Sequence, residues 1–346
     1  MTDPNVEAKA SEIAAEVRSG DRVALAKAIT LIESSSSAHT RLAEAVLDEA
    51  TDAAADSIRI GFSGMPGAGK STLIEKLGVQ LIARGHRVAV LAVDPSSTES
   101  GGSVLGDKTR MEALSREPNA FIRPTPSRGS LGGVSARTRE AITLCEAAGY
   151  DVILVETVGV GQSEADVARL TDLVFLLVLS GAGDDLQGIK RGVIEHADVV
   201  LVGKADGENI MSARQSVGMY RSVLDVLRKR DSGWNPKVVA VSGVTGTGVD
   251  ELWQLVEEYR RVTGISGFWQ KKREDQLGYW LRSSLVTEIQ HRISASSAVA
   301  YKIADLEKAV RAGEMTPRSA ARQLLRSYIQ SETEANTTNR ADRPQP

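Results

Sequence analysis

A glycine-rich segment, Gly64-Met-Pro-Gly-Ala-Gly-Lys-Ser71, constrains the fold of this chain more than any other feature. It fits the pattern G-x-x-x-x-G-K-[ST], follows the apolar run Ile58–Ser63, and opens an amphipathic pattern that includes Leu73 and Leu77. This strand–loop–helix setting is where the pattern forms a phosphate-binding loop. Glycines let successive backbone N–H groups turn toward phosphate oxygens, and the helix N-terminus adds partial positive charge. The segment therefore predicts a site for the phosphates of a nucleoside triphosphate.

Two side chains of this loop have predictable roles. The Lys70 ammonium should reach the β- and γ-phosphates, and the Ser71 hydroxyl should ligate Mg²⁺. The residues that we expect to hold the nucleotide phosphates are Gly64, Pro66, Gly67, Ala68, Gly69, Lys70, Ser71 and Thr72.

Short apolar runs alternate with longer helical patterns from Ser57 onward. The candidate strands are Ile58–Ser63, Val88–Val93, Ala120–Arg123, Val152–Glu156, Leu173–Leu179, Val199–Gly203 and Val238–Val241. Nearly continuous Val, Ile and Leu are typical of parallel strands that are covered on both faces. The alternation with helices favours right-handed crossovers, so we predict an α/β fold with a mostly parallel, doubly wound sheet flanked by helices.

Helical patterns without strands flank this region. We predict four segments: an N-terminal helical segment over 1–55, a P-loop domain over 56–264, a C-terminal helical arm over 265–331, and a disordered tail over 332–346. In the arm, Leu277, Leu281, Leu285 and Ile289 recur every four residues. Because an amphipathic helix outside a core must bury its stripe somewhere, this arm favours a dimer interface.

Composition excludes several classes of protein. The chain has 346 residues and a formal charge of -3, which gives no reason to expect nucleic-acid binding. One cysteine, Cys145, excludes a disulfide framework within the chain, and we expect a buried structural thiol. The polar start carries no secretory signal, and no apolar run is long enough to cross a bilayer. We expect a soluble, cytoplasmic protein with no membrane partner.

Three carboxylates are candidates for holding Mg²⁺, which prefers hard oxygen ligands. Asp94 and Glu156 each end a predicted strand, and Asp107 lies in a glycine-rich stretch. Ligands of open α/β sheets bind at the carboxyl ends of the strands, so Glu156 lies beside the phosphate loop if its strand neighbours the first. Gly159, shortly after Glu156, could present its backbone N–H to the γ-phosphate. A loop-capping or solvated role is the alternative for each carboxylate.

The segment Gly203-Lys204-Ala205-Asp206 is a candidate base pocket. GTP-binding proteins usually carry Asn-Lys-x-Asp here, where the Asp accepts hydrogen bonds from guanine N1–H and the exocyclic amine. Such an acceptor discriminates strongly against adenine. The aliphatic stem of Lys204 would lie over the guanine ring. Gly203 stands where the asparagine is usual, so the side-chain amide of that asparagine is missing. The loop Val241-Ser242-Gly243-Val244 suits a backbone contact to guanine O6, and we expect Ser242, Gly243 and Val244 to bind the base.

From about Gly20 to Gln330 the chain resembles the MeaB/ArgK family of G-protein chaperones, which includes the methylmalonic aciduria type A proteins. The matching stretches are Gly20–Ser34, the phosphate loop, Val93–Thr98, Gly101–Met111, Glu156–Glu164 and Gly183–Lys190. The resemblance implies a GTPase with a SIMIBI-type G domain, which uses GTP, GDP and Mg²⁺. It implies loading of the cofactor into an adenosylcobalamin-dependent acyl-CoA mutase, usually methylmalonyl-CoA mutase, and protection of that enzyme. It also implies a homodimer formed through the C-terminal helices.

The resemblance also assigns residues. Lys70, Asp94, Asp107 and Glu156 form the catalytic set, and Ser71 joins the three carboxylates as metal ligands. Asp206 reads guanine by the same pattern. The segment Gly181–Lys190 resembles a mobile loop that links the nucleotide state to the partner, with Gln187 and Lys190 as candidate contacts.

We expect in-line attack of water on the γ-phosphate, with Mg²⁺ and Lys70 stabilising the charge. No arginine finger is evident in the chain, so intrinsic hydrolysis should be slow and should rise when the partner docks. The alternatives are an ATPase or kinase linked to lysine, arginine and ornithine transport, a metal-insertion GTPase, and a scaffold that hardly hydrolyses nucleotide. Asp206 argues against the first, and the lack of a Cys/His cluster argues against the second.

Overall fold

The structure is a computed structural model that describes residues 4–34, 36–51, 56–94, 111–126, 133–157, 163–180, 191–226 and 231–341. The chain divides into two compact units, Met1–Gly278 and Tyr279–Pro346. The division falls within one helix, α13 (Phe268–Ala295). The four segment boundaries expected from the sequence stay predictions.

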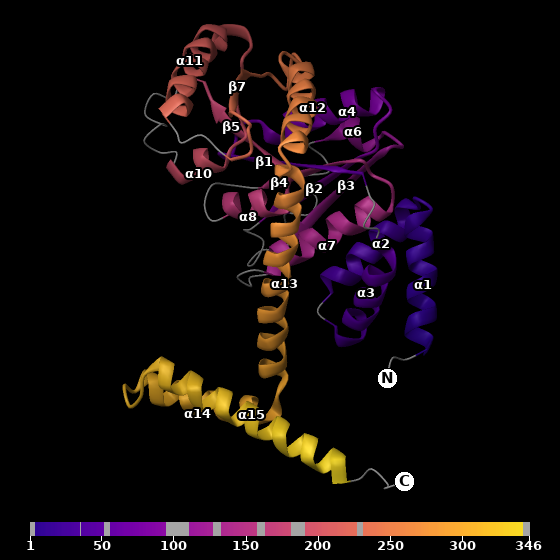
Figure 1. Cartoon of the computed structure of the whole chain (residues 1–346), viewed down its shortest axis with the longest axis vertical. Helices are drawn as coiled ribbons and strands as arrows, with labels where there is room; N and C mark the ends of the chain where they lie inside the picture. Colours follow the sequence, from indigo (N-terminus) through magenta and orange to yellow (C-terminus); the bar gives the residue numbers. More distant parts are fainter. Residues whose placement is uncertain are drawn as a thin grey trace. The chain divides into compact units, whose positions relative to one another are not determined.

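The first unit is built on a parallel sheet, which confirms the predicted fold class (Figure 1). Its strands are β1 (Ile58–Gly64), β2 (Val88–Asp94), β3 (Ala120–Pro126), β4 (Val152–Thr157), β5 (Leu173–Leu179), β6 (Val199–Gly203) and β7 (Lys237–Ala240). Among the described residues this seven-stranded sheet has the order β3-β2-β4-β1-β5-β6-β7. β1 therefore lies between β4 and β5, and Phe62 of β1 pairs with Glu156 of β4.

All seven predicted strands form, and the largest difference is at β3. We expected that strand to stop at Arg123, but it continues through Pro124 and Pro126. β3 is an edge strand that pairs only with β2 in the described sheet. A proline lacks the N–H that a central strand must donate, and an edge strand tolerates this loss on its open side.

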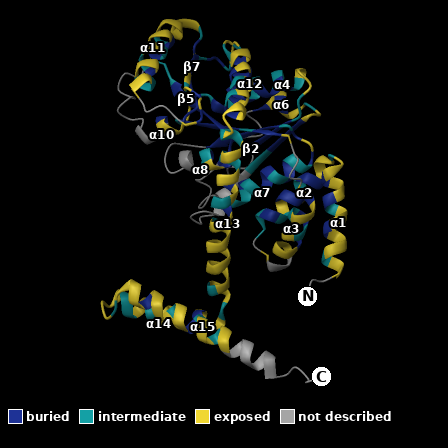
Figure 2. Cartoon of the chain, viewed as in Figure 1, coloured by how far each residue is buried: buried dark blue, intermediate teal, exposed yellow. Residues whose placement is uncertain are grey.

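Helices cover both faces of the sheet (Figure 1). One face carries α4 (Lys70–Ala83), α6 (Glu112–Ser115) and α12 (Val249–Ile265), whose apolar side chains form one core with Ile58, Ile60 and Phe62 of β1. The other face carries α7 (Gly133–Ala147), α8 (Ser163–Leu170), α10 (Arg191–His196) and α11 (Ile210–Val226). Both layers bury the strands, as their apolar sequences predict (Figure 2).

The N-terminal helices are α1 (Pro4–Arg18), α2 (Arg22–Glu33) and α3 (Ser37–Ala50). As predicted, Asp21 caps α2, and its carboxylate accepts hydrogen bonds from the backbone N–H of Val23 and Ala24 at 2.7 and 2.8 Å. These helices are part of the first unit and pack against its α7, where Arg137 donates to the Glu33 carbonyl oxygen at 2.9 Å. Cys145 of α7 is fully buried, as expected of a structural thiol.

Glu140 of α7 makes the stability of this unit depend on pH. Burial raises the pKa of Glu140 from 4.5 to about 6, although Arg139 and Arg137 oppose the shift. The folded state holds this proton at pH values where the unfolded chain has lost it. The free energy of unfolding therefore falls as the pH rises from 4.5 to about 6, by roughly 2 kcal/mol, and then levels off.

We expect Glu140→Gln to remove this fall in the free energy of unfolding, because a glutamine side chain does not ionise. The variant should be more stable than the unaltered chain above pH 6 by at most about 2 kcal/mol. Urea unfolding at pH 4.5 and at neutral pH measures this, with the exposed Glu12→Gln as control. Equal stabilities of Glu140→Gln and the unaltered chain at neutral pH would contradict the expectation.

The beginning of α13 belongs to the first unit. Arg273 binds the buried Asp172 carboxylate through Nε and Nη2, both at 2.8 Å. Gln276 donates to the Thr171 carbonyl oxygen at 2.9 Å. A two-pronged guanidinium–carboxylate pair fixes orientation as well as distance, so the first turns of α13 are anchored at the junction between α8 and β5.

The second unit contains the rest of α13 with α14 (Ser297–Arg311) and α15 (Pro317–Ala341). α15 extends to Ala341, and the predicted tail over 332–346 stays a prediction. Among the described residues no helix combines the length and the apolar character that a membrane crossing needs.

Candidate functional site

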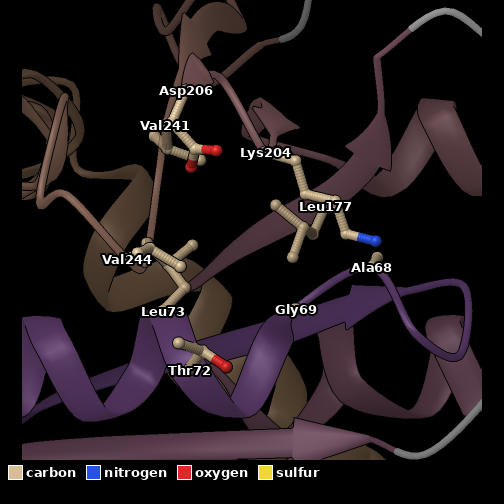
Figure 3. A pocket seen from close by; sticks show the side chains of 11 residues that line it. Ala68, Gly69, Thr72, Leu73, Leu177, Lys204, Asp206, Val241 and Val244 are labelled. Carbon is tan, nitrogen blue, oxygen red and sulfur yellow. The ribbon is translucent and has the colours of Figure 1, made fainter. Parts of the chain in front are cut away.

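A cavity of about 110 Å³ opens at the carboxyl end of the sheet, beside the phosphate loop (Figure 3). Its walls come from the phosphate loop, the start of α4, and the loops that follow β6 and β7. Figure 3 shows Lys204 and Asp206 on one side, with Thr72 and Leu73 of α4 on the other. The lining residues are Ala68, Gly69, Thr72, Leu73, Leu177, Gly203, Lys204, Asp206, Val241, Gly243 and Val244.

Gly64 begins the phosphate loop at a position where only glycine fits. Its φ is +139°, and a Cβ there would lie 2.2 Å from the carbonyl oxygen of Leu177. The close approach follows from the sheet, because Gly64 and Leu177 pair between β1 and β5. The chain can therefore leave the strand sharply and wrap the loop over the start of α4.

Lys70 lies folded over the loop that it follows. Its ammonium donates to the carbonyl oxygens of Gly64 and Met65, at 2.7 and 3.1 Å. Burial lowers the pKa of Lys70, and the negative charge of Glu156 partly opposes that shift. A buried cation beside the loop is a charge that phosphate oxygens would satisfy better than neutral carbonyls do.

Ser71 and Glu156 come together in the way that the sheet order requires. The Ser71 hydroxyl donates to Glu156 Oε1 at 2.8 Å, and Glu156 is buried, with 5% of its surface exposed. A hydroxyl and a carboxylate at this distance are hard oxygen donors of the kind that Mg²⁺ prefers. The two side chains therefore fit a magnesium site next to the γ-phosphate end of the loop.

Asp206 is held in place by the loop after β7. The Ser242 hydroxyl donates to Asp206 Oδ2 in a short hydrogen bond, and the Thr245 N–H donates to that hydroxyl at 3.1 Å. The backbone N–H of Ala205 also donates to the Val241 carbonyl oxygen at 3.0 Å. These contacts leave Asp206 Oδ1 to accept from a ligand in the cavity.

Lys204 has a backbone conformation that costs free energy. With a φ of 54° it is the non-glycine residue of the described chain that adopts the left-handed region. Such a residue costs on the order of 1 kcal/mol and persists where the surroundings impose it, often at a functional site. The strained turn directs Lys204 into the cavity between the phosphate loop and Asp206 (Figure 3).

The structure brings together most of the residues that the sequence singled out. Ala68, Gly69, Thr72, Lys204, Asp206, Gly243 and Val244 line the cavity, and Ser242 supports Asp206. Asp94 ends β2, but its side chain lies outside the described part of the chain. Asp107, Gly159 and the segment 181–190, with Gln187 and Lys190, also lie outside the described residues.

Sequence reasoning missed two of the lining residues, Leu73 and Leu177. Gly203 and Val241, which also line the cavity, lie in the two segments predicted to surround the base. Leu177 is in a uniformly apolar strand, and its place beside the phosphate loop follows from its pairing with Gly64. Gly203 carried a signal, because it stands where an asparagine is usual.

Comparison with known proteins agrees with this geometry. Residues 25–298 match the family model described as methylmalonyl Co-A mutase-associated GTPase MeaB. A probable GTPase of Mycobacterium tuberculosis is 49% identical over 90% of this chain and 93% of its own length. The methylmalonic aciduria type A homolog of Mus musculus, a mitochondrial protein, is 44% identical over 89% of this chain and 77% of its own length.

A solved structure is similar to this chain in its fold as well as in its sequence. The crystal structure of a LAO/AO transport system kinase is 37% identical, with a TM-score of 0.70 over 95% of this chain and 99% of that chain. The family match spans the phosphate loop, the Ser71–Glu156 pair and the base cavity, which are the parts that a GTPase needs. With its phosphate loop, its Asp206 pocket and this match, the chain belongs to the MeaB family of GTPases.

Proposed function

We propose that the cavity binds GTP and that the adjoining oxygen ligands hold the Mg²⁺ that hydrolysis requires. Ser71 and Glu156 would hold the ion, together with Asp94 and Asp107. When bound, the ion neutralises charge that develops on the phosphate oxygens. Lys70 would exchange its contacts with the carbonyl oxygens of Gly64 and Met65 for the β- and γ-phosphates. Gly159 would sense the γ-phosphate.

We further propose that this GTPase acts as a chaperone for an adenosylcobalamin-dependent acyl-CoA mutase, with methylmalonyl-CoA mutase as the partner. The observation that carries this proposal is the family match over residues 25–298, since that family is described by its association with the mutase. The mouse relative named for methylmalonic aciduria supports the same partner. The GTPase would assist cofactor loading and protect the mutase from inactivation.

GTP turnover with and without the mutase tests this proposal. We expect slow hydrolysis by the free chain and a clear increase on adding a methylmalonyl-CoA mutase, because a docked partner can complete the transition-state contacts. A mutase from a cobalamin-independent family is the control. Fast turnover by the free chain, or no response to any cobalamin-dependent mutase, would contradict the proposal.

The exposed apolar stripe of α13 supports a homodimer. Leu281, Leu285 and Ile289 are spaced four residues apart and expose 73%, 58% and 46% of their surface. Val286 beside them is also exposed. Contiguous exposed apolar side chains on one helix mark an interaction surface, and a second copy of the chain would cover the stripe with an identical one.

We expect Leu281→Glu combined with Leu285→Glu to produce a monomer, because two charges on each copy would have to be buried unpaired. Light scattering after size-exclusion chromatography measures the mass. The matched control is Thr287→Glu together with Gln290→Glu, which adds the same charges at two exposed positions on the side of α13 away from the stripe. A dimer that survives both leucine substitutions would refute this interface.

An ATPase or kinase linked to amino-acid transport is the second candidate, since the solved relative bears the name of a transport system kinase. Asp206 argues against it, because adenine offers no matching pair of hydrogen-bond donors to that carboxylate. A metal-insertion role is the third candidate. Nothing favours it, since no group of three or more His, Cys, Asp or Glu suited to a metal occurs among the described residues.

A scaffold that hardly hydrolyses nucleotide is the remaining candidate. A lysate pull-down compares how much mutase the chain captures in the GDP state and with a non-hydrolysable GTP analogue, which separates a nucleotide-locked scaffold from a hydrolysing chaperone.

A further inference from the structure

The end of β6 contributes only backbone to the base cavity, because residue 203 is a glycine. A Cβ at Gly203 would lie 3.2 Å from the Ala68 carbonyl oxygen, 3.2 Å from Leu177 Cδ1 and 3.3 Å from the Val178 carbonyl oxygen. Both Gly203 and Ala68 line the cavity. A side chain at residue 203 would therefore extend between β6 and the phosphate loop, at the edge where the base meets the loop.

The remaining polar side chains of the cavity are few. Of the described lining residues, only Thr72, Lys204 and Asp206 carry polar side chains. Asp206 is a hydrogen-bond acceptor, and the Ser242 hydroxyl holds its carboxylate in place by donating to Oδ2. Thr72 belongs to the first turn of α4, across the cavity from Lys204 and next to the phosphate loop (Figure 3). Its hydroxyl lies at the phosphate end of the site.

Guanine has two edges that a protein can read. Its N1–H and exocyclic amine are donors, and its O6 and N7 are acceptors. Asp206 matches the donor edge, and the backbone of the 242–244 loop suits O6. Lys204 lies along the ring face if its stem covers the base. No described side chain then remains to donate to N7.

We propose that Gly203 leaves guanine N7 unread, so that this chain recognises guanine through O6, N1–H and the exocyclic amine alone. This inference rests on the proposed base pocket. Gly203 is a specificity-determining position, and a nucleotide that lacks the N7 acceptor should bind as tightly as GTP.

A matched nucleotide pair tests the proposal. In 7-deaza-GTP a C–H replaces N7 and the donor edge is unchanged. Competition against a fluorescent GDP analogue on the full chain with Mg²⁺ gives both dissociation constants. We expect them to agree within about twofold, which is less than the contribution of one net hydrogen bond. Binding of GTP about fivefold or more tighter than 7-deaza-GTP would overturn the proposal.

Two variants test the role of residue 203 itself. Gly203→Asn places an amide at the edge of the base, and the glycines on both sides of Ala68 let that carbonyl yield the few tenths of an ångström that a Cβ needs. This variant should prefer GTP over 7-deaza-GTP by about fivefold. Gly203→Ala adds the Cβ without the amide and should show no preference.

The outcomes separate the inference from the proposed function. If the unaltered chain binds neither nucleotide, the base pocket itself is wrongly assigned. If it binds both equally and Gly203→Asn also binds both equally, the assignment of residue 203 is overturned while the pocket stands.

Discussion

Replacing Lys70 by alanine is expected to lower the rate of GTP hydrolysis about 10³-fold, the loss typical of removing one group that stabilises transition-state charge. Lys70 is the cation that lies over the phosphate loop, within 2.7 Å of the Gly64 carbonyl oxygen. In the variant the negative charge of the γ-phosphate would lose the side chain that neutralises it. Phosphate release under saturating GTP measures the effect.

The fold should survive this change, because the substitution removes a buried charge that costs free energy to desolvate. Thermal unfolding should therefore differ little between Lys70→Ala and the unaltered chain. Lys76→Ala, on the same helix but beyond the loop, is the matched control and should keep nearly full activity. If both alanine variants hydrolyse GTP at the unaltered rate, Lys70 has no catalytic role.

Replacing Asp206 by asparagine should change which purine the protein binds. An asparagine keeps one oxygen to accept from Ser242 but turns an amide N–H₂ toward the base. Guanine then meets a donor where it needs an acceptor, whereas xanthine presents a carbonyl oxygen at that position. We expect affinity for GTP to fall by about 10²-fold or more and affinity for XTP to rise, because a mismatched buried donor is costly.

Competition binding with GTP, XTP and ATP measures this change of preference. Ser242→Ala is a matched variant that loosens the carboxylate without changing its chemistry. It should weaken GTP binding by roughly tenfold, the value of about one hydrogen bond, and leave XTP excluded. An Asp206→Asn protein that still prefers GTP over XTP would show that another residue reads the base.

The sequence predicts the sheet because its strands carry a strong local signal. Runs such as Leu173–Leu179 are apolar at every position and only seven residues long, which is typical of strands buried on both faces. The phosphate loop is equally local, since its glycines and Lys70 lie within eight consecutive residues. Such features need no knowledge of the tertiary structure.

The rest of the site depends on pairing between distant segments. Leu177 lies beside the phosphate loop because β5 pairs with β1, and the Asp206–Ser242 contact joins residues 36 positions apart.

If the cavity between the phosphate loop and Asp206 selects a guanine nucleotide, the chain must distinguish GDP from ADP. Calorimetric titration of the full chain with GDP and with ADP, each with Mg²⁺, tests it most directly. We expect GDP to bind at least about 100-fold more tightly than ADP. Equal affinities, or tighter binding of ADP, would contradict it.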